Sequence, residues 1–447
     1  MAPHLLLLNT YRTVCKRERR IHEMSLVPES PPPMTERPLK RLALYSHDGF
    51  GLGHFRRCLL LAQNVQEHLQ DIQIMLITGS PKAAFFSLPK NTELVLIEPV
   101  TKDGNGKYIS RNPQLDHITA FKRRRDKLRT KLLEFNPDLF VVDHVPTGLN
   151  GELIPLLADL KQRGTELAIG LRDIIDESHR VQSDWGNEGS KILVESLYDH
   201  IWVYGNQSIF NIGKLYNLSQ GTQNRIEYLG YLRRIKSSVF NEEHLMRLKH
   251  RFSIAKKIVC VTGGGEDGLP VGETFLQTLK DNPNKYYGTL ITGPHLSRQN
   301  ARNLAEKYQG SRNTEIMRFT THLEDHLKSA DLIVSMGGYN ATLEAIALKK
   351  PTIIIPRISP RKEQLIRATK FAELNLIAMI HPDKLNTEVL NDVIKQSLER
   401  SFSPTAEDAG LHMDGIGNFL SRVDEILLRQ RISRKEENDF KNKLLRA

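Results

Sequence analysis

Three side chains have the types and positions needed for proton transfer: His54, Asp143 and His144. His54 comes after the apolar run RLALYS and a glycine-rich loop, and the other two directly follow the run DLFVV. A histidine can take the proton of an attacking hydroxyl or water, and a carboxylate can orient such a base. Capping or phosphate binding at a helix start is an equally good interpretation of His54, as capping is of Asp143. Adjacent residues at a strand end point apart, so Asp143 and His144 need not form a pair.

Glycine-rich segments follow three apolar runs and are typical of phosphate-binding loops. Glycine lets the backbone approach a ligand closely, and a helix that begins there points free N–H groups at an anion. A simple tight turn is the alternative for the second segment. The residues concerned are Gly49, Gly51 and Gly53 in the first segment, Gly263, Gly264 and Gly265 in the second, and Gly337, Gly338, Asn340, Ala341 and Thr342 in the third.

The first glycine segment lacks the fingerprint of a dinucleotide site. Its third glycine is replaced by His54, and the next strand ends in Thr78 instead of an acidic residue, so NAD binding is disfavoured. After the third segment, Glu344 lies in the first turns of a predicted helix, where a carboxylate can accept hydrogen bonds from a ribose diol. Arg56 and Arg57 are candidates for contacting an anion.

Short apolar runs alternate with helical patterns from Arg41 onward, which is the rhythm of a parallel sheet flanked by helices. The pattern predicts an α/β fold with two Rossmann-like, doubly wound domains that face each other across a cleft. Ligands bind such sheets beyond the carboxyl ends of the strands, so the loops named above are expected to hold the site. The expected strands are 41–46, 72–78, 93–97, 138–142, 166–171, 200–204, 257–261, 288–292, 315–319, 331–335, 352–355 and 376–379.

Four segments are expected along the chain. Residues 1–38 mix arginines with prolines and are predicted to be a disordered leader. One Rossmann-like domain is expected over 39–230 and a second over 241–405, with 228–240 as the best linker. Residues 406–447 are expected to hold a packed helix at 413–430 and a basic tail.

The composition is that of an ordinary globular protein of 447 residues, with 39% hydrophobic and 26% charged residues. The cysteines are three and scattered, which excludes a disulfide framework or a CxxC metal site and favours a reducing, cytoplasmic location. No apolar run approaches the length of about 20 residues that spans a bilayer.

The net charge of +11 favours an anionic partner only where it is clustered. The excess lies in 1–41, 121–135 and 429–447, so nucleic acid is not an expected partner. The segment 121–135 carries seven Lys or Arg. Peripheral contact with an anionic membrane surface is one interpretation of it, and a solvated outer face is the favoured one.

The glycine segments, together with SMGGYNATLE, resemble the glycosyltransferase-B superfamily. Residues 334–370 look like the donor-binding region of the N-acetylglucosaminyl transferases of peptidoglycan synthesis. The strings SHDGFGLGHFRRCLLLA, VVDHVPTGLNGEL, GLRDIID and GGYNATLEA resemble a group of predicted bacterial glycosyltransferases. The likeness runs from Arg41 to about Leu428, and 334–370 is its most specific part.

This resemblance implies roles for several residues. The glycines at 263–265 and the turn at 338–341 would hold the diphosphate of a nucleotide-sugar donor, Glu344 the ribose, and Gln364 the hydroxyls of the sugar. The loop that ends at Gly53 and His54 would face the reacting centre from the acceptor side. The nucleotide sugar is a substrate, and neither a cofactor nor a metal is expected.

The expected function is therefore transfer of a hexose-type sugar from a nucleoside-diphosphate sugar, with UDP favoured, to an unidentified acceptor hydroxyl. The reaction is expected to be inverting and metal-independent. Two alternatives stay open. The first is a nucleotide-sugar hydrolase, because the segment 51–62 also resembles the hydrolases of nonulosonic-acid synthesis, which use the same fold. The second is a non-catalytic protein that binds sugar nucleotides.

Overall fold

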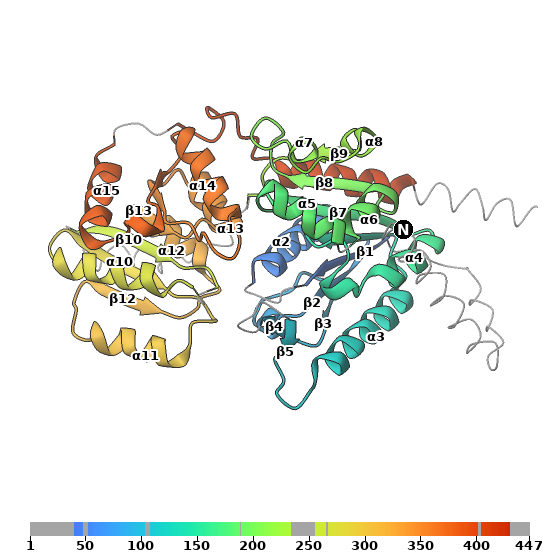
Figure 1. Ribbon diagram of the computed structural model, residues 1–447, viewed down its shortest axis with the longest axis horizontal. Coiled ribbons are helices and arrows are strands. Elements are labelled where there is room, and N and C mark those ends of the chain that lie inside the picture. Colours follow the sequence, from blue (N-terminus) through green and yellow to red (C-terminus); the bar gives the residue numbers. More distant parts are fainter. Residues whose placement is uncertain are drawn as a thin grey trace, which may run out of the picture. The chain divides into compact units, whose positions relative to one another are not determined.

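The computed structural model describes residues 40–47, 52–102, 108–187, 189–233, 255–264, 267–400 and 404–429. Most of the described strands belong to two fully parallel sheets with helices packed on them (Figure 1). The short strands β4 (Val100–Lys102) and β5 (Tyr108–Ser110) pair separately and antiparallel. The expected α/β class is confirmed.

The first sheet has the strand order β3-β2-β1-β6-β7-β8-β9. The order reverses direction between the neighbours β1 and β6, and ligands bind beside such a switch point in open parallel sheets. The strands are β1 (Lys40–Ser46), β2 (Ile72–Thr78), β3 (Thr92–Leu96), β6 (Leu139–Asp143), β7 (Glu166–Arg172), β8 (His200–Tyr204) and β9 (Ile226–Tyr228).

The second sheet repeats this plan with the order β12-β11-β10-β13-β14-β15. Its switch point lies between β10 and β13, where Val261 is in register with Ser335. The strands are β10 (Lys256–Val261), β11 (Tyr286–Ile291), β12 (Thr314–Met317), β13 (Leu332–Ser335), β14 (Thr352–Ile354) and β15 (Ala378–Met379).

Helices follow most strands and cover the sheets. Among the described residues, none is long and apolar enough to cross a membrane. They are α2 (Gly53–His68), α3 (His117–Phe135), α4 (Ile154–Gln162), α5 (Ser178–Asn187), α6 (Ser190–Ser196), α7 (Ile212–Leu215), α8 (Gln220–Gln223), α10 (Leu269–Asp281), α11 (Arg298–Lys307), α12 (Leu323–Ser329), α13 (Tyr339–Ala347), α14 (Glu363–Glu373) and α15 (Thr387–Glu399), with short 3₁₀ turns at Pro81–Phe85, Leu149–Gly151 and Pro382–Lys384.

The first sheet is buried on both faces, which explains why its strands read as continuous apolar runs. Leu42 and Leu44 of β1 pack into the same core as Phe55 of α2. The alternate residues Ala43 and Tyr45 pack into the opposite core. This alternation follows from the two-residue period of a strand, and it fixes how β1 presents its last residues to the site.

The C-terminal helix, over 415–429, returns to the first sheet. Its buried residues Ile416, Phe419 and Val423 belong to the core that contains β1 and α2. The Phe419 ring meets the buried Trp202 of β8 edge-on, with centroids 5.4 Å apart. This helix lies within the segment 413–430 where a packed helix was expected, and the tail beyond it lies outside the described residues.

The basic side chains of helix α3 are not all exposed to solvent. Most of its Lys and Arg residues are exposed, but Arg124 is fully buried. Its Nε and Nη2 donate to the two oxygens of Glu152, each at 2.7 Å, and Tyr45 also donates to that carboxylate. The expectation of a solvated face is thus wrong for Arg124, because the guanidinium is neutralised within the core.

Candidate active site

Three histidine rings gather at the switch point of the first sheet. His47 follows β1, His54 lies in the first turn of α2, and His144 follows β6. The ring centroids of His47 and His54 are 4.4 Å apart, and those of His54 and His144 are 5.2 Å apart. The parallel pairing of β1 with β6 brings these positions together, although about 90 residues separate them in the chain.

Asp143 holds the ring of His54. Asp143 Oδ2 lies 2.5 Å from His54 Nδ1, and the carboxylate is buried. Because an ionised carboxylate only accepts hydrogen bonds, Nδ1 carries the proton of this contact, and the neutral tautomer that fits it has its lone pair on Nε2. This arrangement leaves Nε2 ready to accept a proton.

Arg57, one turn along α2 from His54, clamps the same carboxylate. Its Nε donates to Asp143 Oδ1 at 2.7 Å and its Nη2 to Oδ2 at 2.6 Å. Burial alone would raise the pKa of Asp143, but the charge of Arg57 and the contact with His54 outweigh it and lower that pKa below its usual range. Asp143 therefore remains an anion beside His54.

His144 has an unusual backbone for a residue that is not glycine, with φ at +73°. Such left-handed conformations cost energy and are concentrated at functional sites. Its Nε2 accepts a hydrogen bond from Arg172 Nη2 at 2.9 Å. Burial lowers the pKa of His144 well below its usual value, and the charge of Arg172 adds to this effect, so the ring is neutral.

The second sheet presents glycine-rich backbone at its own switch point. Gly263 follows β10 with φ at +66°, a conformation that favours glycine. Gly293, after β11, has φ at +86°, and a Cβ there would lie 2.3 Å from the Gly263 carbonyl oxygen. The two loops therefore pack backbone against backbone. The His295 N–H donates to the Gly264 carbonyl, which fixes this arrangement.

The third glycine segment forms the start of α13. Gly337 has φ at +79°, and Gly338 is the N-cap of the helix. A Cβ on Gly338 would meet no atom within 4 Å, so open space lies in front of this turn. Free N–H groups at a helix start attract phosphate oxygens, so the turn is suited to a diphosphate. Thr342 is buried, and its Oγ1 has no partner among the described residues.

Two residues expected on the donor side contact α2 instead. Glu344 Oε1 lies 3.0 Å from Arg56 Nη2, while Glu344 Oε2 is buried and, in the part of the chain that the structure describes, has no partner. Asn340 Nδ2 donates to the Gly53 carbonyl at 3.0 Å. The cavity beside them, which Leu60 and Leu232 also line, measures about 10 Å³. It has room for about one water molecule and none for a nucleoside.

Gln364 lies in the first turn of α14, beside the carboxyl end of β14. Its Oε1 accepts the Arg357 backbone N–H at 3.0 Å. The Arg357 side chain donates to Glu363 at 2.7 Å and lies 3.7 Å from Asp267. Gln364 is therefore held at the same edge as the glycine segments.

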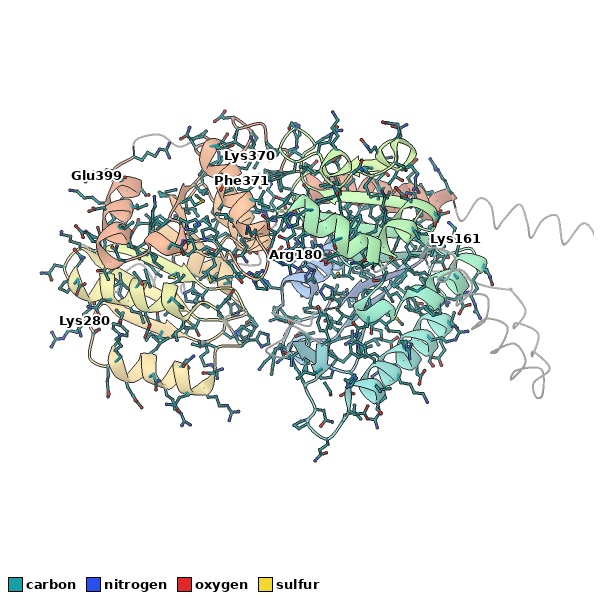
Figure 2. The ribbon with its side chains drawn as sticks, in the orientation of Figure 1. Lys161, Arg180, Lys280, Lys370, Phe371 and Glu399 are labelled. Atoms are coloured by element: carbon teal, nitrogen blue, oxygen red, sulfur yellow. The ribbon has the colours of Figure 1, made fainter. Side chains whose placement is uncertain are left out.

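A buried ion pair connects the loop after β7 with α14. Arg367 donates from Nε and Nη2 to Asp173, with the shortest distance 2.6 Å. Nearby, Asp176 accepts the Lys362 backbone N–H at 2.8 Å, and Arg180 of α5 donates to the Pro360 carbonyl (Figure 2). The segment GLRDIID thus joins the histidine cluster to the helix that carries Gln364.

Most predicted site residues meet at the two switch points. His54, Asp143 and His144 come together at the first, and Gly263, Gly264, Gly337, Gly338, Asn340, Ala341, Thr342, Glu344 and Gln364 lie around the second. Gly53 opens α2. Gly49, Gly51 and Gly265 lie outside the described residues. The functional roles of all these residues stay predictions.

The sequence analysis did not single out His47 and His295, and it expected another role for Arg57. Both histidines stand in loops that follow strands, and this position is the sequence signal that could have indicated them. Burial lowers the pKa of His295 to about 4, with Arg111 and Lys82 adding to the effect. Arg57 was expected to contact an anionic ligand, but it binds Asp143, a partner 86 residues away in the chain.

Residues 258–413 match the model of the glycosyltransferase family 28 C-terminal domain. The UDP-N-acetylglucosamine–N-acetylmuramyl-(pentapeptide) pyrophosphoryl-undecaprenol N-acetylglucosamine transferase of Alkaliphilus oremlandii is 25% identical over 169 residues, which are 37% of this chain and 46% of the relative. The transferase of the same name from Clostridium perfringens is 26% identical over 178 residues, 39% of this chain and 47% of the relative. The chain thus spans about half the length of these curated relatives.

Solved structures with the same architecture match most of the chain. A glucosyltransferase of anthocyanidin, solved with UDP, has a TM-score of 0.58 at 11% identity and covers 88% of this chain and 100% of its own. The kitacinnamycin glycotransferase has a TM-score of 0.57 at 16% identity with the same coverage. MurG of Acinetobacter baumannii has a TM-score of 0.52 at 12% identity, covering 86% and 99%. At these identities the likeness establishes the fold.

Proposed function

We propose that this chain, which has the glycosyltransferase-B fold and a family 28 C-terminal domain, transfers a hexose-type sugar from a UDP-sugar to an acceptor hydroxyl. The observation that carries the proposal is the pair His54 and Asp143 at one switch point, with glycine loops and a helix start at the other. The first can activate a hydroxyl, and the second is suited to a diphosphate. The named curated relatives act with UDP-N-acetylglucosamine, which favours UDP as the nucleotide.

In the proposed reaction, the acceptor hydroxyl gives its proton to His54 Nε2 as its oxygen attacks the anomeric carbon. The bond from that carbon to the β-phosphate oxygen breaks, and its electron pair leaves with UDP. Attack from the face opposite the leaving group inverts the anomeric configuration. Asp143 stabilises the imidazolium that forms, and Arg57 keeps Asp143 in position.

The leaving diphosphate takes up negative charge as the bond breaks. Backbone N–H groups of the loops at Gly263 and Gly338 and the N-terminus of α13 are suited to stabilise that charge without a metal. Glu344 binds the ribose in this proposal, so Arg56 must release it when the donor enters. Gln364 binds hydroxyls of the sugar.

The test uses the full chain with a panel of UDP-, GDP- and TDP-sugars. A donor that binds the native state raises the melting temperature, and UDP-sugars are expected to raise it most. UDP release and the sugar product are then measured with and without cell-derived acceptor fractions. Acceptor-dependent release with a glycosylated product supports transfer. Equal release with free sugar indicates the hydrolase alternative, and no binding of any donor contradicts the proposal.

We also propose that α3 makes peripheral contact with an anionic membrane surface. Lys122 and Arg125 are exposed on one helical face with Ile118, which is 70% exposed. Cationic groups beside an exposed apolar side chain are typical of interfacial binding. Sedimentation with phosphatidylglycerol vesicles is expected to carry the protein down, and phosphatidylcholine vesicles to leave it in solution. Sedimentation that is unchanged in a Lys122→Gln/Arg125→Gln variant contradicts the proposal.

A further inference from the structure

Arg172 differs from the other guanidinium groups at the two switch points. Each of those has a carboxylate partner: Arg57 pairs with Asp143, Arg367 with Asp173, Arg56 with Glu344 and Arg357 with Glu363. Among the described residues, no carboxylate lies within ion-pair distance of Arg172. Arg172 is half-buried, and a cation partly withdrawn from water is less stable without a partner, so this position is suited to an anion that the described chain does not supply.

The hydrogen bonds of Arg172 leave part of its donor capacity unused. It ends β7, and its Nη2 donates to His144 at 2.9 Å. Its Nε is buried and has no partner among the residues that the structure describes. The pKa of Arg172 is lowered to about 10: burial lowers it most, Arg57 and Arg367 also lower it, and Glu363 and Asp143 oppose them. An anion bound here would relieve both the unmet donor and the repulsion between guanidinium groups.

His144 and His47 add polar atoms to the same place. His144 accepts the Arg172 bond at Nε2, so its proton lies on Nδ1, and within the described ranges that N–H is buried without a partner. His47 Nδ1 is likewise buried without a partner in the described part of the chain, and the rings of His47 and His144 are 6.5 Å apart. Buried polar atoms without partners are rare in native proteins, and several in one cluster indicate a ligand.

The geometry points to Arg172, with His144 and His47, as a binding site for an anionic group of the acceptor, a phosphate or a carboxylate close to the hydroxyl that attacks. This inference rests on the proposed function. The acceptor, not the donor, supplies the anion in this inference, because His47 and His144 follow β1 and β6 and Arg172 ends β7, whereas the glycine loops proposed for the donor diphosphate belong to the second sheet. The substrate class is thus a hydroxylated phosphate or carboxylate.

The test keeps the donor side filled with saturating UDP and measures binding of small anions by calorimetry at constant ionic strength. The probes are glycerol 3-phosphate and D-lactate, with glycerol as the uncharged comparison. The wild-type protein is expected to bind at least one anion and not glycerol. The Arg172→Gln variant is expected to lose affinity by about 10- to 100-fold, since hydrogen bonds to charged groups are lost. The anion that binds better identifies the class.

The matched control is Arg163→Gln, which removes an exposed guanidinium from the C-cap of α4 and is expected to bind the anion as the wild type does. Equal anion binding by wild type and Arg172→Gln overturns the inference, as does equal binding of glycerol. If UDP does not bind the wild type, the proposed function fails instead. If Arg172→Gln does not fold, the His144→Asn variant is tested instead, because asparagine tolerates the positive φ of this position. It is expected to lose several-fold in affinity for the anion.

Discussion

The two switch points have different parts in the proposed reaction, and they differ in whether side chains or backbone groups form the site. The first is built from side chains: His54 and Asp143 meet there with Arg57 bound to the carboxylate. The second is built from backbone, where Gly263 and Gly293 adopt positive φ and pack against each other. Proton transfer needs a titratable group, whereas a diphosphate is recognised by N–H groups that every residue carries.

This difference determines how each region can be damaged. Removing a side chain should disable the first region, since the neighbouring buried charges then lose a partner. Adding a single Cβ should disable the second, since its loops approach each other closely. Substitutions of each kind therefore separate the two regions experimentally.

The largest expected change in stability comes from Asp143→Ala. The substitution leaves Arg57 buried without its carboxylate and should lower the free energy of unfolding by about 3–5 kcal/mol, as measured by urea denaturation. The double variant Arg57→Met/Asp143→Ala removes both charges and should recover part of that loss. A single-variant loss below about 1 kcal/mol would mean that the clamp is not a stabilising pair.

At the second region, Gly293→Ala should weaken UDP binding by at least about tenfold. Its Cβ would lie 2.3 Å from the Gly263 carbonyl oxygen, so the loop proposed to bind the diphosphate must move. Calorimetric titration with UDP measures the effect. Gly186→Ala, where a Cβ meets no atom within 4 Å, is the control and should bind UDP normally. If the affinity for UDP is unchanged in Gly293→Ala, this loop does not contribute to donor binding.

A smaller effect distinguishes the regions by pH. Burial lowers the pKa values of His47 and His144, so below the usual value of 6.5 the unfolded chain binds protons that the native state does not. Stability should therefore fall as pH falls from 7.5 to 5.5, before the carboxylates titrate. The urea midpoint, measured at each pH, reports this fall in stability. Its dependence on pH should become weaker in the His47→Asn/His144→Asn variant. In His295→Asn, which removes the low-pKa histidine of the second region, much of that dependence on pH should persist.

A slope that is unchanged in His47→Asn/His144→Asn would show that these rings are already protonated, or remain solvated, in the native state. The comparison between a titratable first region and a backbone-built second region would then lose its electrostatic basis.

The sequence predicted most of the fold because buried parallel strands read as continuous apolar runs. The expected strand at 72–78 coincides with β2, and that at 200–204 with β8. The strands β4 (VTK), β5 (YIS) and β9 (IEY) were missed because polar or charged residues interrupt them, so none is a continuous apolar run. The helix over 415–429 was predicted from its amphipathic pattern. Its packing on β8, through Phe419 and Trp202, could not be predicted because it is a contact between residues far apart in the sequence.

The site was predictable where its signals are local. Glycine segments and helix starts stand together in the chain, so the loops at 263–264 and 337–338 were found. The contact between His54 and Asp143 joins residues 89 positions apart, and neither residue shows its partner in the sequence. Glu344 illustrates the same limit, because its present partner Arg56 lies 288 positions away.

The most direct test of the division between the two regions is the His54→Ala variant, measured for turnover and for UDP affinity together. The proposed base touches the acceptor and not the nucleotide, so kcat should fall by about a hundredfold to ten-thousandfold while the Kd for UDP stays within about twofold. Near-normal turnover in this variant, or a loss of UDP binding that accounts for the fall, would contradict the account.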